Sequence, residues 1–452
     1  MNPEFQRNLW LEAGPRRLAW TAVALAAVYG AAVLIGQQHP LQALGMAGAA
    51  VFLVTALLWA PRIAGRAIAD EVMQRTWDFQ RLSALTPWDM AWGKLFGATS
   101  LAWIAAFTGL VLATVATMMT GGGDKAVQAA ISGVGIAVLL QAGSMALALV
   151  GVRRARAEGR SGAFRFTLGG LVGLIVVAST LAKVLPTRGQ GLGLGLGLGG
   201  PMDWITAGSG KVVWWGLPIP GGWFLAGSLL AFAAWALVAA WRLMRLELQM
   251  ENFPWAWPLF TLFAGIWAAG VIDAGVGARF AVAGAVFAAC AYASAFAEPA
   301  DRVRLRRFAD ALAARDLAGA AYAAPAVIAP VKLAGLAVIG VALAPHGIGA
   351  ATPPALLALA AFAFLLRDLG VVAYFRFGPR PGRGDFGAVL GLFLAYFVGG
   401  IVGSQIGGPA GMALFTPSPA QPAIAAVSGG VQAILVWILA WSRIRAPERR
   451  EG

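Results

Sequence analysis

Long apolar stretches alternate with short polar connections along nearly the whole chain. A helix that crosses a membrane needs about 20 consecutive, mostly apolar residues, and twelve stretches fit this requirement. They cover residues 18–36, 41–60, 96–119, 127–151, 165–185, 222–241, 255–272, 277–297, 332–350, 354–375, 386–404 and 422–441. The pattern therefore predicts an all-α, polytopic membrane protein with 12 transmembrane helices.

The basic residues in the connections test this count independently. If the N-terminus is cytoplasmic, all but five of the 34 basic residues fall in cytoplasmic segments. The five outer ones are Lys125, Lys183, Arg188, Lys211 and Arg279. Cytoplasmic connections carry an excess of Lys and Arg, and a missed or additional span would disrupt this alternation. We therefore expect both termini in the cytoplasm.

Composition agrees with a membrane protein. Hydrophobic residues make up 59% of the chain and charged residues only 12%, whereas soluble domains are about 25% charged. The net charge of +14 would suggest nucleic-acid binding in a soluble protein. Here the Arg residues sit in short loops, where they orient the spans, so we expect membrane lipids and no nucleic acid as partners. The bias toward Arg, Ala and Gly is typical of a GC-rich bacterial genome, which favours the bacterial cytoplasmic (inner) membrane.

The chain offers little material for chemistry of its own. Cys290 is the only cysteine, and His39 and His346 are the only histidines, so neither an internal disulfide nor a metal site built from this chain alone is expected. The nearest approach to a nucleotide-binding P-loop, Gly208-Ser-Gly210-Lys211, lacks the first Gly and the final Ser or Thr. We expect no enzyme activity and no bound cofactor in this chain.

Carboxylates are also scarce within the predicted spans. Arg367 and Asp368 lie a turn or two from the inner end of the tenth span, and we place no Asp or Glu plainly at the centre of any span. Transporters coupled to protons or sodium use carboxylates at that depth. The pattern therefore argues against an ion-coupled mechanism, which stays open as an alternative.

The chain repeats itself at an offset of 238 residues. The motif Pro-x6-Lys-Leu-x-Gly begins at Pro87 and again at Pro325, each time in a long inner segment that follows two spans. These segments cover residues 61–95 and 298–331. Equal topology around equal motifs indicates duplication. We expect two pseudo-symmetric six-helix halves, 1–248 and 249–452, related by an axis along the membrane normal.

The first inner segment has the pattern of an amphipathic helix over residues 66–85. Apolar residues recur on one face at helical spacing, and a polar stripe covers the other. Pro87 is expected to end this helix, and Lys94 to extend its ammonium group to the cytoplasmic surface. A helix that only anchors the loop at the membrane interface is an alternative interpretation.

The same segment resembles a known family. The run Glu71-Val-Met-Gln-Arg75-Thr76, the later Pro87, and Gly93-Lys94 at the next span are similar to the coupling segment of type-two ATP-binding-cassette (ABC) exporter permeases. That family has an acidic residue, Gly-Thr, a hydrophobic stretch ending in Pro, and Gly-Lys. Arg75 departs from the pattern at the Gly position, and the second segment lacks the Glu and Gly-Thr signature.

The resemblance implies that a separate cytoplasmic ABC ATPase docks on these segments. It assigns the coupling role to Glu71, Arg75, Thr76, Asp78, Arg81, Pro87 and Lys94 in the first segment, and to Arg307, Asp310, Arg315, Asp316, Pro325 and Lys332 in the second. ATP and Mg would bind to the ATPase, with two copies for each permease chain. The expected function is outward movement of a lipid-like or amphipathic substrate. An ATPase-linked subunit with a regulatory or envelope-assembly role is a further alternative.

Overall fold

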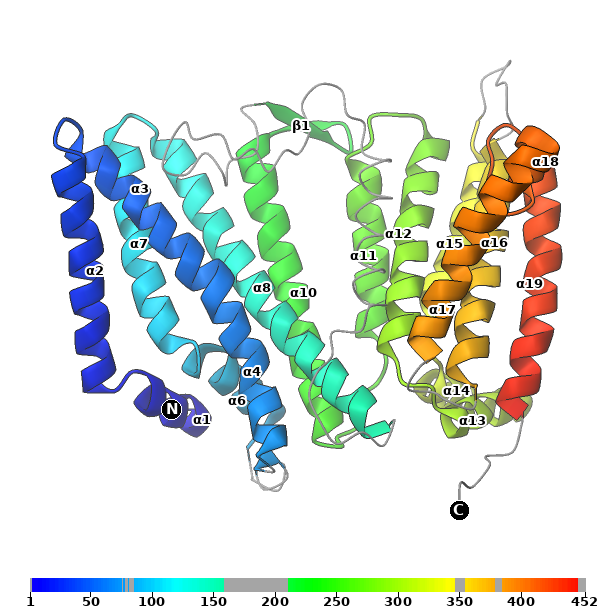
Figure 1. Cartoon of the computed structure of the whole chain (residues 1–452), viewed down its shortest axis with the longest axis horizontal. Coiled ribbons are helices and arrows are strands. Elements are labelled where there is room, and N and C mark those ends of the chain that lie inside the picture. The colour runs from blue at the N-terminus through cyan, green and yellow to red at the C-terminus, as the bar shows by residue number, and fades with distance from the viewer. Residues whose placement is uncertain are drawn as a thin grey trace.

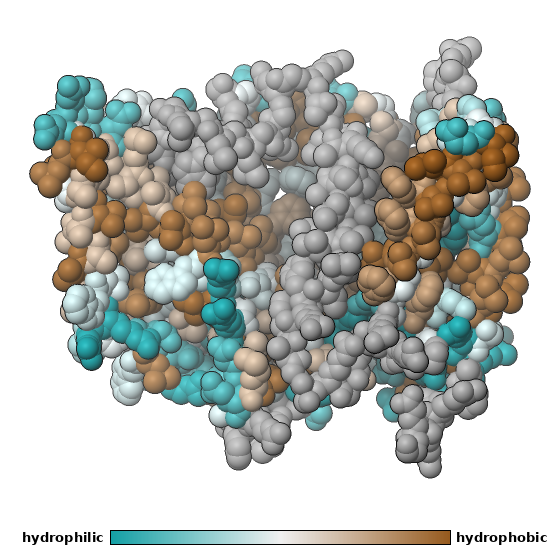
Figure 2. Space-filling view, in the orientation of Figure 1, coloured by the Kyte–Doolittle hydropathy of each residue, from teal (hydrophilic) through white to brown (hydrophobic). Residues whose placement is uncertain are grey.

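The computed structural model describes residues 2–74, 76–77, 80, 85–157, 210–345, 354–378 and 384–445. Within these ranges nine helices are long and apolar enough to cross a membrane, or ten if one sharply bent pair counts as a single span. Hydrophobic residues form a band between two more hydrophilic edges (Figure 2). The prediction of a multi-pass helical membrane protein is confirmed. The predicted span 165–185 lies outside the described residues.

The helices form two groups that lie side by side (Figure 1). The N-terminal group contains α1 (Pro3–Glu12), α2 (Pro15–Ile35), α3 (Pro40–Phe52), η1 (Leu53–Trp59), α4 (Ala60–Met73), α6 (Pro87–Trp92), η2 (Gly93–Gly97), α7 (Ser100–Met119), α8 (Gly123–Ala157) and α10 (Gly221–Glu247). The C-terminal group contains α11 (Ala256–Gly270), α12 (Val276–Ala297), α13 (Arg302–Ala313), α14 (Leu317–Ala323), α15 (Ile328–Leu343), α16 (Pro354–Arg376), α17 (Gly384–Phe393), η4 (Leu394–Val398), α18 (Gly399–Ala413) and α19 (Pro422–Arg445). The η elements are π-helical segments within longer helices.

Short helices mark one end of the bundle. Figure 1 places α1, α13, α14 and the C-terminal end of α19 at the bottom, and we call this end the basic face. The antiparallel hairpin of β1 (Lys211–Trp214) and β2 (Leu217–Pro220) lies at the opposite end. The described part of the chain therefore begins and ends on the same side of the bundle.

Both groups use the same order of helix pairings. In the N-terminal group α2 packs on α3, α3 on α7, and α8 on α10; in the C-terminal group α11 packs on α12, α12 on α15, and α16 on α19. Small residues permit close approach of membrane helices. At the α3–α7 crossing, a Cβ added to Gly109 would lie 2.4 Å from the carbonyl oxygen of Gly48.

Aromatic side chains join the two groups between α10 and α11. The ring of Phe232 meets the ring of Trp267 edge-on at 5.2 Å between centroids, and Trp235 lies 5.7 Å from Phe260. The Trp267 indole N–H donates to the Ser228 hydroxyl oxygen at 3.0 Å. Edge-to-face ring pairs are favourable beyond the area that they bury.

The single amphipathic helix predicted over 66–85 is wrong. Helix α4 continues directly from the span formed by α3 and η1 and ends at Met73, and Thr76 is not helical. The Thr76 backbone N–H donates to the Glu71 carbonyl oxygen at 3.0 Å, which closes a turn where the helix would have continued. Pro87 begins α6 behind the N-cap residue Thr86, because proline fits the first position of a helix and lacks the N–H that would remain unpaired there.

The connection between the predicted spans 386–404 and 422–441 is partly helical. Helix α18 reverses at Gly408, whose backbone has φ 57° and ψ −139°, a combination open essentially to glycine. The two arms of the reversal touch, since a Cβ added to Gly411 would lie 2.0 Å from the carbonyl oxygen of Gly403. The chain after Gly408 thus turns back toward the helices instead of forming an open loop.

Candidate coupling site at the basic face

Helix α1 folds back over the start of the α6–η2–α7 segment. Asn2 caps α1 by accepting hydrogen bonds from the backbone N–H groups of Glu4 and Phe5 at 3.0 and 3.1 Å, and its own amide donates to the Asp89 carbonyl oxygen at 2.7 Å. Gly93 leaves the space that α1 occupies, because a Cβ there would lie 2.7 Å from the Glu4 side chain. The sequence thus provides a glycine groove for an N-terminal helix that begins with a carboxylate.

Lys94 lies at the bottom of this groove. Its ammonium group pairs with Glu4 at 3.2 Å and with Glu71 at the end of α4, and its side chain is only 1% exposed. Arg7 bridges both carboxylates from outside, at 3.0 Å to Glu4 and 3.1 Å to Glu71. The expectation that Lys94 reaches the surface is wrong, because α1 covers it. We call Glu4, Arg7, Glu71 and Lys94 the lysine cage.

The lysine cage is neutral overall and fixes three segments to one another. Two carboxylates face one ammonium and one guanidinium, so each buried charge has a partner, as burial requires. The Trp77 ring lies 5.4 Å from the Lys94 ammonium, and the Gln80 amide donates to Glu71 at 2.7 Å. The described part of the predicted coupling segment is therefore tied to the start of a membrane helix.

A second contact connects this segment to α8 and α10. The indole N–H of Trp77, which is 2% exposed, points to the buried Glu247 carboxylate at the end of α10, at 3.4 Å. Arg156 near the end of α8 donates to the same carboxylate at 2.9 Å. The hydrophobic cluster that surrounds Trp77 contains Ile68, Met90, Leu95, Met145 and Met244, from five different elements. Movement of Trp77 would disturb all of these elements.

The structure places the other predicted residues of the first segment as follows. Thr76 donates its hydroxyl to the Glu71 carbonyl oxygen at 3.2 Å, next to the lysine cage, and Pro87 is the first residue of α6. Arg75, Asp78 and Arg81 lie outside the described residues.

The second segment does not reproduce the lysine cage. Lys332, which matches Lys94 in the repeat, is exposed on α15. In this segment the Glu298 carboxylate connects two parts of the chain. It pairs with Arg304 and accepts a hydrogen bond from the Ala326 backbone N–H at 2.7 Å. Pro325 precedes α15 and accepts a hydrogen bond from Ile328 at 3.1 Å through its carbonyl oxygen.

The charged residues predicted in the second segment are all exposed on or beside α13. Arg307 and Asp310 lie on α13, and Arg315 and Asp316 form the turn to α14. Arg315 has φ 58°, and the Asp316 carboxylate caps α14 by accepting from the Gly319 N–H at 2.9 Å. The segment is thus a helix–turn–helix that presents charge of both signs at the basic face.

Sequence reasoning missed an ion bridge between the two groups of helices. Arg154 near the end of α8 donates to the Asp385 carboxylate at the start of α17 at 2.6 Å and to the Phe296 carbonyl oxygen at 2.7 Å. Arg376 at the end of α16 lies 3.3 Å from the same carboxylate. These partners are far apart in sequence, so only the folded chain reveals the bridge.

The sequence also did not reveal that Asp368 is buried and hydrogen-bonded inside the bundle. This residue lies eight positions before the end of α16, which is about 12 Å from the basic-face end at 1.5 Å per residue. Its carboxylate is 1% exposed and accepts hydrogen bonds from the hydroxyls of Tyr292 at 2.6 Å and Tyr396 at 2.7 Å. Arg367 donates to Asp368 at 2.8 Å and to the Phe415 carbonyl oxygen at 3.2 Å. A charged network therefore lies well inside the apolar band.

Comparison of the chain with protein-family models, with curated proteins and with solved structures finds no match in any of the three.

Proposed function

We propose that this chain is the membrane-spanning permease subunit of an ATP-driven ABC exporter, with the basic face in the bacterial cytoplasm. The observation that carries the proposal is the lysine cage. It joins the residues that resemble the family's coupling segment, Glu71 and Lys94, through buried ion pairs to α1 and to the helix that continues as α7.

A rigid coupling element is what an external motor needs. A push that moved only the chain between α4 and α6 would have to separate the buried ion pairs. Removing one partner from a buried ion pair costs about 3–5 kcal/mol. The force is transmitted to α4 and α7 through the lysine cage and to α8 and α10 through Trp77 and Glu247. Such rigid-body movement of packed helices is a known way to change access to a central path.

The repeated pairings support a permease made of two fused six-span units. The pairings α8–α10 and α16–α19 correspond, as do α3–α7 and α12–α15. The two coupling segments differ, however, since one holds a buried lysine cage and the other an exposed charged helix–turn–helix. We propose that one chain takes two cytoplasmic ATPase subunits, which bind ATP and Mg, at two unequal sites. A lipid-like or amphipathic substrate would move outward between the units.

The test is the ATP hydrolysis that co-purifies with the tagged chain from its native membranes. We expect the double variant Asp78→Lys, Arg81→Glu to lose most of this activity, because it reverses two charges of the segment that resembles the coupling element. Arg445→Glu is the control, since Arg445 stacks on Trp441 at the end of α19 and belongs to neither segment. Equal activity in the double variant and the control would contradict docking at this segment.

The buried Asp368 favours one second candidate, an ion-coupled secondary transporter. A carboxylate inside the membrane that contacts two tyrosine hydroxyls is the kind of group that carries protons in such proteins. This alternative requires two results in reconstituted vesicles without ATPase. An imposed pH gradient must drive uptake or release of the substrate, and Asp368→Asn must abolish this transport. We expect no gradient-driven transport, because Arg367 neutralises the carboxylate directly.

A further inference from the structure

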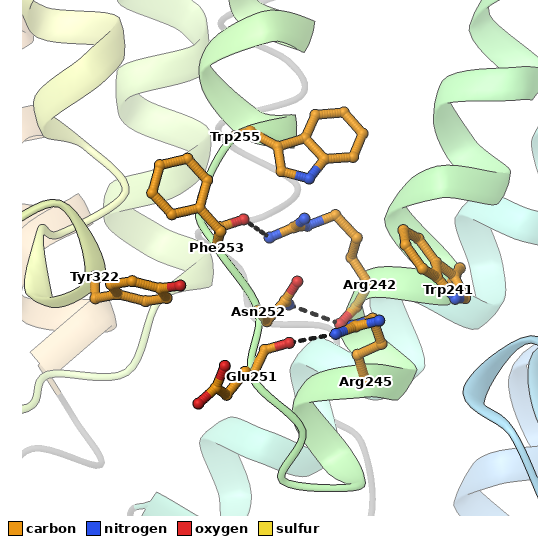
Figure 3. A pocket seen from close by; sticks show the side chains of 8 residues that line it. All are labelled: Trp241, Arg242, Arg245, Glu251, Asn252, Phe253, Trp255 and Tyr322. Atoms are coloured by element: carbon orange, nitrogen blue, oxygen red, sulfur yellow. Dashed lines mark hydrogen bonds between the residues drawn. The ribbon is translucent and has the colours of Figure 1, made fainter. Parts of the chain in front are cut away.

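A cavity of about 290 Å³ opens at the basic face where the two groups of helices meet. Figure 3 shows the side chains that line it, which come from the end of α10, the connection to α11, and α14. They are Trp241, Arg242, Arg245, Glu251, Asn252, Phe253, Trp255 and Tyr322. Tyr322 lies in the second inner segment, 298–331, and the other seven residues lie outside both inner segments.

Among the residues that the structure describes, two guanidinium groups in this cavity have no carboxylate partner. Arg242 donates to the Phe253 carbonyl oxygen and stacks 5.1 Å from the Trp255 ring. Arg245 donates to the Glu251 carbonyl oxygen and lies 5.3 Å from the Trp241 ring. Within the described chain neither guanidinium forms an ion pair, and Figure 3 shows the Glu251 carboxylate turned away from both.

The neighbouring contacts hold these cations in position before any ligand arrives. Backbone carbonyls and indole rings fix each guanidinium but do not neutralise it, so several N–H donors remain available. The Asn252 amide donates to the Arg242 carbonyl oxygen at 3.1 Å, and its buried Oδ1 atom accepts no hydrogen bond from any described residue. The planar N–H fork of each guanidinium group matches the geometry of a phosphate or carboxylate group.

Aromatic side chains make the remaining wall. Phe253 and Tyr322 meet edge-on at 5.4 Å between ring centroids, and each is 50% exposed. Trp255 begins the approach to α11 and is 37% exposed. Exposed aromatic rings at the end of membrane helices prefer the level of the lipid headgroups. The cavity thus offers cations for a headgroup and rings for the chains below it.

We propose that this cavity binds the anionic, phosphate-bearing headgroup of an amphiphile in the membrane leaflet at the basic face. Arg242 and Arg245 hold the phosphate, and Phe253, Trp255 and Tyr322 contact the first carbons of the acyl chains. The proposal goes beyond the exporter function and requires no ATPase, so its test uses the purified chain alone. Failure of either proposal therefore leaves the other standing.

The probe is dihexanoyl phosphatidate, titrated into the wild-type chain in a neutral detergent and followed by thermophoresis. We expect saturable binding at least about tenfold tighter than that of dihexanoyl phosphatidylcholine or inorganic phosphate. The first comparison tests the need for a net anionic headgroup, and the second tests the need for acyl chains. Both use the wild-type chain, so neither depends on the folding of a variant.

The variant arm uses Arg242→Gln together with Arg245→Gln. We expect phosphatidate binding to weaken by at least about tenfold, because charge-assisted hydrogen bonds to phosphate are lost. Arg445→Gln is the matched control, since Arg445 also stacks on an indole ring at 4.8 Å near the basic face but does not line the cavity. Equal binding by the double variant and the control would overturn the proposal. Equal binding of phosphatidylcholine would do the same, and equal binding of inorganic phosphate would refute an amphiphile as the ligand.

Discussion

Replacing Lys94 by Met removes the cation from the lysine cage and nearly preserves side-chain length. Lys94 is 1% exposed and Glu4 4%, so the remaining carboxylates cannot be fully hydrated. At 3.2 Å and an effective dielectric constant of about 20, the Lys94–Glu4 attraction is on the order of 5 kcal/mol before desolvation is counted. Breaking buried pairs by removal of one partner costs about 3–5 kcal/mol. Because Arg7 still contacts both carboxylates, we expect the lower value, about 3 kcal/mol.

The assay is reversible unfolding in mixed detergent micelles, followed by circular dichroism. The repeat supplies a matched control, because Lys332 occupies the corresponding position but is exposed. We expect Lys332→Met to change the free energy of unfolding by less than about 0.5 kcal/mol, as surface substitutions usually do. A triple variant, Glu4→Gln, Glu71→Gln and Lys94→Met, should recover more than half of the free energy of unfolding that Lys94→Met loses, because it leaves no buried charge unpaired. Equal stability of Lys94→Met and Lys332→Met would refute the reasoning.

The same assay tests two further features. Arg154→Gln and Asp385→Asn should show a coupling energy of about 1–3 kcal/mol in a double-mutant cycle, since the two side chains form the bridge between α8 and α17; additive single effects would show that the bridge contributes nothing. Gly408→Ala should destabilise by about 1–3 kcal/mol because of its φ of 57°. Gly407→Ala, whose Cβ would meet nothing within 4 Å, should stay within about 1 kcal/mol; equal effects of the two substitutions would contradict the reversal.

The sequence predicted what depends on local pattern. Apolar length is a property of each stretch by itself, so helices such as α2 and α10 lie close to the predicted ranges. The position of Pro87 marked the boundary before the next span, although proline begins α6 there instead of ending a helix. The helix predicted over 66–85 failed because helical periodicity alone does not show where a backbone turn will interrupt it.

What the sequence did not reveal depends on contacts between distant residues. The lysine cage joins residues up to 90 positions apart, and Asp368 finds its tyrosine partners on α12 and η4. The sequence nevertheless contains residues that hint at both sets of contacts. Gly93 and Gly97, four positions apart, provide a smooth helix face for close packing. Isolated tyrosines in apolar spans, such as Tyr292 and Tyr396, need a partner for their hydroxyls when they are buried.

The central claim is that one fused chain is driven by two separate ATPase subunits. Native mass spectrometry of the complex purified from its own membranes tests it most directly. We expect one 46.7 kDa chain together with two nucleotide-binding subunits. A complex with two copies of this chain, or a chain that purifies without any ATP-hydrolysing subunit under conditions that preserve membrane complexes, would contradict it.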